Sequence, residues 1–122
     1  MEKELDMIDY VGEGYKGMIS FESWRVAFLR YAERFDADKI CRLERHLLTD
    51  EVFVLLEGEA RLIIGDSEEV IDMEAHKLYN VKKGVWHGIT VSRDAKVLIV
   101  ENDDTGLENT EYREYNKERT KQ

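Results

Sequence analysis

The chain has 122 residues, which is enough for one domain with one hydrophobic core. Asp and Glu (27) outnumber Lys and Arg (18), and the net charge of −9 argues against nucleic acid or an anionic membrane as the main partner, because phosphate groups are bound by concentrated positive charge. The longest apolar run, Val52 to Leu56, is far shorter than the ~20 residues of a membrane-spanning helix. Cys41 is the single cysteine, so no disulfide forms within the chain and a reducing cytoplasm is the expected location.

The N-terminal part of the chain divides into an arm and a long apolar segment. Residues 1–13 are acidic and irregular, and we expect them to form an arm. Further on, apolar residues recur with a period of two, as at Trp24, Val26 and Phe28, and this period is typical of strands. The pattern predicts one long strand with two apolar faces from Met18 to Tyr31.

After a turn at residues 36–39, short apolar segments follow one another at close spacing. Gly, Asp and Ser residues separate them, and one pair of segments has the pattern of a hairpin. Such a series predicts an all-β fold, either a sandwich or a closed barrel. The expected strands are residues 40–47, 52–56, 60–64, 70–73, 78–81, 86–91 and 96–101.

The end of the chain is polar and differs from the strands before it. We expect residues 102–122 to form a tail, with one or two helical turns near residues 110–117 and with Tyr112 and Tyr115 as packing anchors. The chain is therefore predicted to consist of an arm (1–13), a β-barrel (14–101) and a polar tail (102–122).

Two blocks of residues have the spacing of known sequence motifs. Four residues separate His46 from Glu51, six separate Glu51 from Gly58, and two separate Gly84 from His87. This arrangement resembles the two motifs of the cupin superfamily, which read Gly-x5-His-x-His-x(3,4)-Glu-x6-Gly and Gly-x5-Pro-x-Gly-x2-His-x3-Asn. The resemblance spans roughly residues 40–101 and implies a double-stranded β-helix, the cupin or jelly-roll barrel.

The sequence departs from these motifs at several positions. The first His of the first motif falls at Glu44, while the leading Gly, the Pro and the final Asn of the second fall at His76, Lys82 and Val91. One of the four metal ligands that the resemblance implies has therefore changed its identity.

The residue chemistry also allows a metal site. A period of two places Glu44 and His46 on one face of a strand, Glu51 begins the next strand, and His87 comes from a distant one. Two imidazoles and one carboxylate would form the facial triad that suits non-haem iron, with Glu44 as a possible fourth ligand. In the alternative, Glu44 pairs with Arg42 instead. The predicted cofactor is a divalent metal ion (Fe, Mn, Ni or Zn).

Other residues near these motifs have predicted places in the barrel. Arg42, Phe53 and Trp86 are expected to line the pocket, with Arg42 suited to an anionic ligand. Cys41 has apolar neighbours and is expected to be a buried thiol without catalytic chemistry.

Two functions follow from these observations. The first is a small metal-binding cupin that acts on or senses a small polar molecule at the barrel mouth, where a metal would act as a Lewis acid or an O₂ site if the protein is catalytic. The second is a metal-free ligand-binding or structural barrel, which the changed positions Glu44 and Lys82 favour. The sequence leaves open whether the protein is an enzyme and which residues would be catalytic.

A homodimer is also predicted. The segment at residues 15–31 is apolar, and many cupins dimerise through N-terminal strands.

Overall fold

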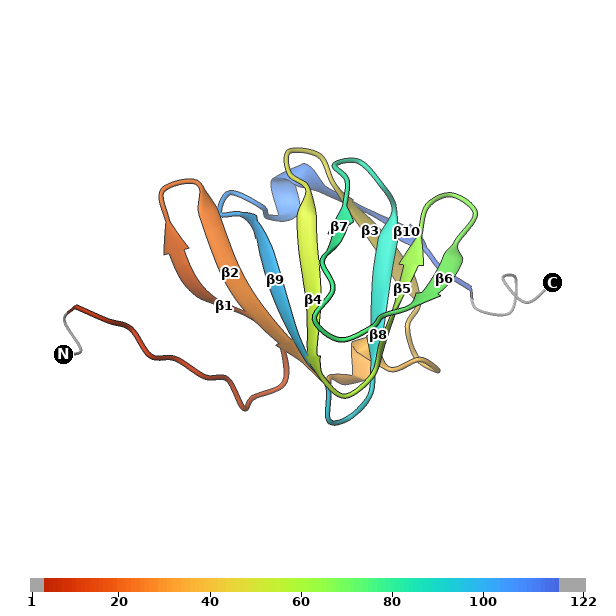
Figure 1. The fold of residues 1–122 in the computed structure, drawn as a ribbon. Coiled ribbons are helices and arrows are strands. Elements are labelled where there is room, and N and C mark those ends of the chain that lie inside the picture. The colour runs from red at the N-terminus through yellow and green to blue at the C-terminus, as the bar shows by residue number, and fades with distance from the viewer. Residues whose placement is uncertain (1–3, 117–122) are drawn as a thin grey trace.

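The computed structural model describes residues 4–116, and they form two antiparallel five-stranded sheets that face one another across the core (Figure 1). The first sheet has the order β1-β2-β9-β4-β7 and the second the order β10-β3-β8-β5-β6. The first three residues of the expected arm and the last six of the expected tail lie outside the described residues. The strands are β1 (Gly14–Phe21), β2 (Trp24–Arg30), β3 (Arg42–His46), β4 (Glu51–Glu57), β5 (Ala60–Ile64), β6 (Glu69–Asp72), β7 (Tyr79–Val81), β8 (His87–Val91), β9 (Lys96–Asn102) and β10 (Thr110–Glu114).

The period of two in the sequence becomes alternating burial in the strands. In β4, Glu51, Phe53 and Leu55 are buried and their neighbours are partly exposed. Side chains from both sheets meet in one core, since Phe53 and Ile99 of the first sheet pack with Leu62 and Ile89 of the second. The predicted all-β jelly-roll fold is confirmed, and two short 3-10 helices, η1 (Glu33–Phe35) and η2 (Leu107–Asn109), complete the described elements.

The prediction of one long strand from Met18 to Tyr31 is wrong, because the chain reverses in its middle. β1 and β2 form a hairpin in which Phe21 lies opposite Trp24. Glu22 makes the turn with a φ of 51°, a conformation that Gly or Asn usually supplies. Since both strands share the period of two, the apolar pattern continues through the turn and does not reveal it.

The prediction of helical turns near residues 110–117 is also wrong. Residues Thr110–Glu114 form β10, which pairs with β3 over its whole length and places Thr110 opposite His46. The second sheet thus extends beyond residue 101, because the edge of β3 offers unpaired backbone groups that β10 satisfies. Tyr115 is buried against Leu43 and Ile63, which confirms it as a packing anchor.

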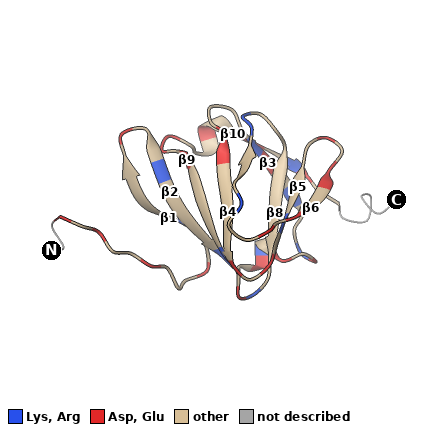
Figure 2. Ribbon diagram, in the orientation of Figure 1, with Lys and Arg blue, Asp and Glu red and all other residues tan. Residues whose placement is uncertain are grey.

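The charged residues and Cys41 have distinct places in the fold. Most charged residues lie in loops and at strand ends (Figure 2). Cys41, expected to be buried, is exposed, because it precedes the first residue of β3 at the edge of the space between the sheets. In the described part of the chain, no helix has the length and apolarity to cross a membrane.

Candidate metal and ligand site

Four titratable side chains meet at one end of the two sheets. His46 ends β3 and His87 begins β8, and these strands are antiparallel neighbours in which Glu44 lies opposite His87. Glu51 begins β4, and Glu101 lies near the end of β9, its antiparallel neighbour. Antiparallel pairing therefore brings residues that are far apart in sequence to the same end of the core.

The glycines of the two motifs have structural roles near this site. Gly84 has a φ of 81°, and its N–H donates to the carbonyl of His46 at 2.8 Å, which holds the turn before β8 against the end of β3. Gly58 has a φ of 74°, and a Cβ there would lie 2.7 Å from the Cα of Ala95. Gly84 is thus favoured by its conformation, and Gly58 by both its conformation and the lack of space for a side chain, which explains their place in the pattern.

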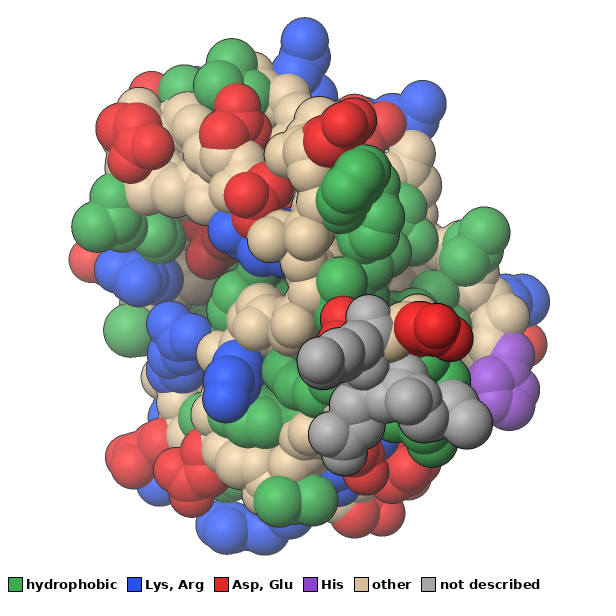
Figure 3. Space-filling model, turned by 90° about the vertical axis from the view of Figure 1, so that its left-hand side faces the viewer, with side chains coloured by type: hydrophobic (Ala, Val, Ile, Leu, Met, Phe, Trp, Pro, Cys, Tyr) green, Lys and Arg blue, Asp and Glu red, His purple; other side chains and the backbone are tan. Residues whose placement is uncertain are grey.

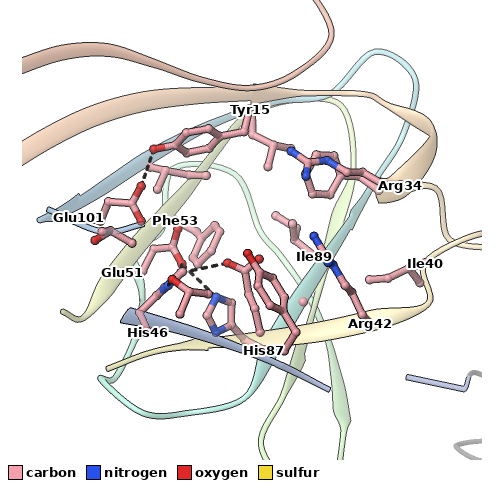
Figure 4. A pocket seen from close by; sticks show the side chains of 18 of the residues that line it. Tyr15, Arg34, Ile40, Arg42, His46, Glu51, Phe53, His87, Ile89 and Glu101 are labelled. Atoms are coloured by element: carbon pink, nitrogen blue, oxygen red, sulfur yellow. Dashed lines mark hydrogen bonds and ion pairs between the residues drawn. The ribbon is translucent and has the colours of Figure 1, made fainter. Parts of the chain in front are cut away.

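The two histidines point toward the same carboxylate oxygen (Figure 4). Oε1 of Glu51 lies 3.0 Å from Nε2 of His46 and 2.9 Å from Nε2 of His87. Oε2 of Glu44 lies 3.1 Å from Nε2 of His46, so Glu44 contacts the site from a half-buried position. His46, Glu51 and His87 are all buried.

The other ring nitrogen of each histidine has a fixed partner. Nδ1 of His46 lies 3.0 Å from the hydroxyl of Thr110, and Nδ1 of His87 lies 3.0 Å from the carbonyl oxygen of Val85. Because a carbonyl only accepts, His87 Nδ1 carries a proton, and Nε2 of a neutral His87 then turns a lone pair toward the Glu51 carboxylate. Only a cation between them, a second proton or a metal ion, makes this contact favourable.

These residues fit a divalent metal ion. Glu44, His46 and His87 each offer one ligand atom, and these three atoms lie within 4.8 Å of one another; the same holds for one ligand atom each from His46, Glu51 and Glu101. Imidazole and carboxylate ligands suit first-row transition metals. Hydrogen bonds that hold Nδ1 and aim Nε2 at the site are also typical of metal-binding histidines.

The charges in the site shift the pKa values of its members. Burial alone would lower the pKa of His46, but hydrogen bonds and charges from Glu44 and Glu51 outweigh it and raise the pKa from 6.5 to about 10. Burial also opposes the charged form of His87, yet contact with Glu51 raises its pKa. Burial would raise the pKa of Glu51, but the two histidines lower it from 4.5 to about 2. The Glu51 carboxylate thus favours the imidazolium form of both histidines without a metal.

A second buried carboxylate was not predicted from the sequence. Oε2 of Glu101 accepts hydrogen bonds from the hydroxyl of Tyr15 and from Nη2 of Arg25, the latter at 2.9 Å. Burial and the nearby charge of Glu51 raise the pKa of Glu101 despite these donors. The period of two in β9 could have predicted that Glu101 is buried, because Glu101 lies on the same inward face of the strand as Val97 and Ile99.

The site opens into a pocket of about 500 Å³ between the two sheets. Arg42 and Phe53 line this pocket as predicted, and the Phe53 ring meets the His87 ring edge-on, with centroids 5.9 Å apart. Trp86 is not among the residues that line it. Because neighbouring residues of a strand point to opposite faces, Trp86 points away from His87 and packs near Leu43, with Arg45 and Arg113 over its ring.

The two alternatives for Glu44 can now be compared. Arg42 does not pair with Glu44 among the described residues, since its guanidinium lies over the ring of Tyr112 at 4.0 Å. Glu44 instead contacts His46. Tyr112, expected to be only a packing anchor, lines the pocket.

Comparison with known proteins shows which solved structures have a similar fold. No family model matches the chain, and no curated protein does. Among solved structures, a cupin-2 domain containing protein from Shewanella frigidimarina is 20% identical and covers 76% of this chain and 84% of its own, with a TM-score of 0.59. Streptomyces PAC13 solved with uridine is 10% identical and covers 93% and 97%, with a TM-score of 0.67, and Pac13 is a nucleoside dehydratase. KdgF from Halomonas sp. is 14% identical and covers 84% and 89%, with a TM-score of 0.58. At these identities the likeness establishes the fold alone.

Proposed function

We propose that this chain, which has the fold of the cupin superfamily, binds a divalent metal ion and binds or acts on a small polar molecule in its pocket. The observation that carries the proposal is the convergence of two histidine Nε2 atoms on Glu51 while both Nδ1 atoms have other partners. His46, His87 and Glu51 would hold the ion, with Glu44 or Glu101 as a further ligand. Such an ion would supply a Lewis acid next to the pocket.

Metal content of untagged protein, purified without chelators, tests this proposal. We expect about one Fe, Mn, Ni or Zn ion per chain, and its loss in the His46→Ala and His87→Ala variants, since imidazole ligands suit these metals. The third histidine of the chain, His76, is exposed and outside the site, so His76→Ala is a matched control that keeps the ion. A wild-type protein that holds no metal even after reconstitution would contradict the proposal.

The second candidate is a metal-free ligand-binding barrel, which the raised pKa values of the two histidines and the lowered pKa of Glu51 favour, because protons can then take the place of a metal ion. The melting temperature with and without EDTA separates the two candidates. An ion bound only to the folded state stabilises it by about 2.7 kcal/mol at a hundredfold excess over its Kd, so EDTA lowers Tm and added metal restores it. A Tm that does not respond to either addition supports the metal-free barrel.

A homodimer also belongs to the proposal. The outer face of the first sheet carries two cross-strand rows of partly exposed apolar side chains, Val26-Val100-Val52 and Phe28-Leu98-Val54. Beside them, Phe21 and Trp24 at the tip of the β1–β2 hairpin are 61% and 43% exposed. An apolar sheet face that continues to an edge strand is typical of a surface between subunits. We propose that a second copy of the chain covers it.

A further inference from the structure

Two arginines line the pocket on the side away from its carboxylates. Arg34 comes from η1 and Arg42 begins β3. Figure 4 shows both side chains on one side of the pocket, with Glu51 and Glu101 on the other. The pocket therefore has a positively charged end and an end where histidines and carboxylates meet.

Within residues 4–116, these two arginines lack the acidic partners that most other arginines have. Five of the arginines between residues 4 and 116 pair with Asp or Glu within 4.0 Å. Among the described residues, no carboxylate lies that close to Arg34 or Arg42, although acidic residues outnumber basic ones. Figure 3 shows Lys and Arg side chains gathered at the left and centre of one face of this acidic protein. Unpaired positive charge at a pocket attracts an anion.

Aromatic rings hold both guanidinium groups in place. The Cζ atom of Arg34 lies 4.6 Å from the ring centre of Phe35, and that of Arg42 lies 4.0 Å from the ring centre of Tyr112. A guanidinium whose face lies over a ring keeps its N–H donors free in its plane, where they can bind a carboxylate or phosphate in a bidentate manner. The rings thus position donors for an anionic group.

The middle of the pocket is apolar. Leu29, Phe53, Ile89 and Ile99 line it and are buried. A pocket of about 500 Å³ has the size of small-molecule sites in proteins. The opposite end is lined by Glu44, Glu51 and Glu101, which repel a second anionic group unless an ion lies between them.

We infer that the pocket binds a small organic anion whose carboxylate or phosphate group is held by Arg34 and Arg42, while its apolar body lies between the sheets and its other end faces His46 and Glu51. This inference deepens the proposed function and rests on it for the site at that far end. The ligand class is a compact molecule with one anionic group, and the two sources of the charge, carboxylate and phosphate, are distinguished by the probes.

Isothermal titration of the full chain with four probes tests the inference. The probes are benzoate, phenyl phosphate, inorganic phosphate and benzamide, of which benzamide has the shape of benzoate without its charge. We expect benzoate or phenyl phosphate to bind about tenfold more tightly than benzamide, because hydrogen bonds to charged groups are the stronger ones. The tighter of the two identifies the anionic group. If none of the three anions binds more tightly than benzamide, the inference is wrong.

Variants assign the binding to the two arginines. The double variant Arg34→Gln/Arg42→Gln should lower the affinity for the anion about tenfold or more, and both side chains are exposed, so the fold is expected to persist. Arg93 also lies over a ring, that of Tyr31, and has no acidic partner within 4.0 Å among the described residues, but it does not line the pocket. Arg93→Gln is therefore the matched control and should bind like the wild type. Equal affinity in the double variant would overturn the inference.

Metal measurements separate this inference from the proposed function. If the double variant keeps its metal and loses the anion, both are supported. If the wild type holds no metal but binds the anion through Arg34 and Arg42, the metal proposal fails and the anion site stands. If metal is bound and the anion affinity does not depend on the arginines, the metal proposal stands and the anion site is wrong.

Discussion

At the scale of single residues, Glu51 and Glu101 are two buried carboxylates with different neighbours. Glu51 contacts two histidines, whose contacts lower its pKa to about 2. Glu101 receives hydrogen bonds from Tyr15 and Arg25, and its pKa is raised by burial and by the charge of Glu51. A buried carboxylate is stable only with partners of this kind, so the donors around each one are needed for the fold as well as for the site.

Arg25→Met tests this dependence. Nη2 of Arg25 lies 2.9 Å from Glu101, and the two side chains are 20% and 3% exposed. Removing the guanidinium leaves a buried carboxylate with one donor, so we expect a loss of roughly 2–4 kcal/mol in the free energy of unfolding, measured with urea at neutral pH.

The control is an exposed pair of similar geometry. Arg61 lies 2.8 Å from Asp72, and both side chains are largely exposed, so Arg61→Met should cost less than about 1 kcal/mol. The double variant Arg25→Met/Glu101→Gln should regain part of the loss, because it buries no unpaired charge. Equal stability of Arg25→Met and Arg61→Met would show that the buried pair does not stabilise the fold.

At the scale of elements, β10 links the polar end of the chain to the site. It covers the edge of β3, and its first residue, Thr110, contacts His46. Beyond it, Tyr115 packs against Leu43 and Ile63, and its N–H donates to the carbonyl of Cys41. A segment without strong apolar periodicity is thus ordered by pairing and by one buried ring.

Tyr115→Ala should show how much this anchor contributes. The ring is buried, and loss of a large buried aromatic side chain costs roughly 3–5 kcal/mol, or somewhat less for a ring at the edge of a small cluster. We expect a clear loss of stability in urea unfolding. The exposed neighbour Glu114 provides the control, and Glu114→Ala should unfold like the wild type. If Tyr115→Ala is equally stable, packing of Tyr115 does not hold β10 in place.

Asp50 joins two loops beside the site. Its carboxylate accepts a hydrogen bond from the N–H of Lys83 at 2.7 Å and one from Nδ2 of Asn80 at 3.1 Å. The loop before β4 is thereby tied to the turn that contains Gly84. These hydrogen bonds, that of the Lys83 N–H first, lower the pKa of Asp50 below its ordinary value of 3.8.

The lowered pKa of Asp50 predicts that the stability difference between the wild type and Asp50→Asn depends on pH. A carboxyl whose pKa is lowered in the folded state stabilises that state fully above 3.8, and the stabilisation is lost as pH falls through the folded pKa. Asp50→Asn should therefore have a lower Tm than the wild type at neutral pH, and the difference should shrink below pH 3.8. Thermal unfolding of both proteins over this range measures it. A difference that stays constant with pH would mean that the charge of Asp50 is not involved.

At the scale of the whole molecule, the two faces of the first sheet differ in what covers them. The inner face packs against the second sheet, whereas the outer face leaves Val26, Phe28, Val52 and Val54 partly exposed.

The proposed homodimer predicts that light scattering gives the mass of two chains. Phe21→Glu/Trp24→Glu should shift it to one chain, because charge at the hairpin tip opposes burial of this face. Val70→Glu, at a 46% exposed position on β6 of the other sheet, is the control. A wild-type mass of one chain would contradict the dimer.

Features of the fold and the site can be predicted from the sequence where the residues that encode them form a pattern along the chain. Strands with one buried face, such as β4, are visible because burial repeats every second residue along the chain itself. The turn at Glu22 and strand β10 are not visible, since one lacks the usual turn residues and the other forms because β3 needs a partner. The spacing of His46, Glu51 and His87 marked the site, and the structure brings these three together.

By itself, the sequence determined the all-β class, the resemblance to the cupin motifs and the residues at the centre of the site, because each is encoded in local spacing. Only the tertiary structure decided that Glu101, held by Tyr15 and Arg25, lies near Glu51, that Trp86 points away, and that Arg34 joins the predicted Arg42 on the far side of the pocket. The physical reason is that cross-strand pairing and the facing of two sheets join residues from distant parts of the chain, and such contacts depend on register and twist, which no local pattern of side chains specifies.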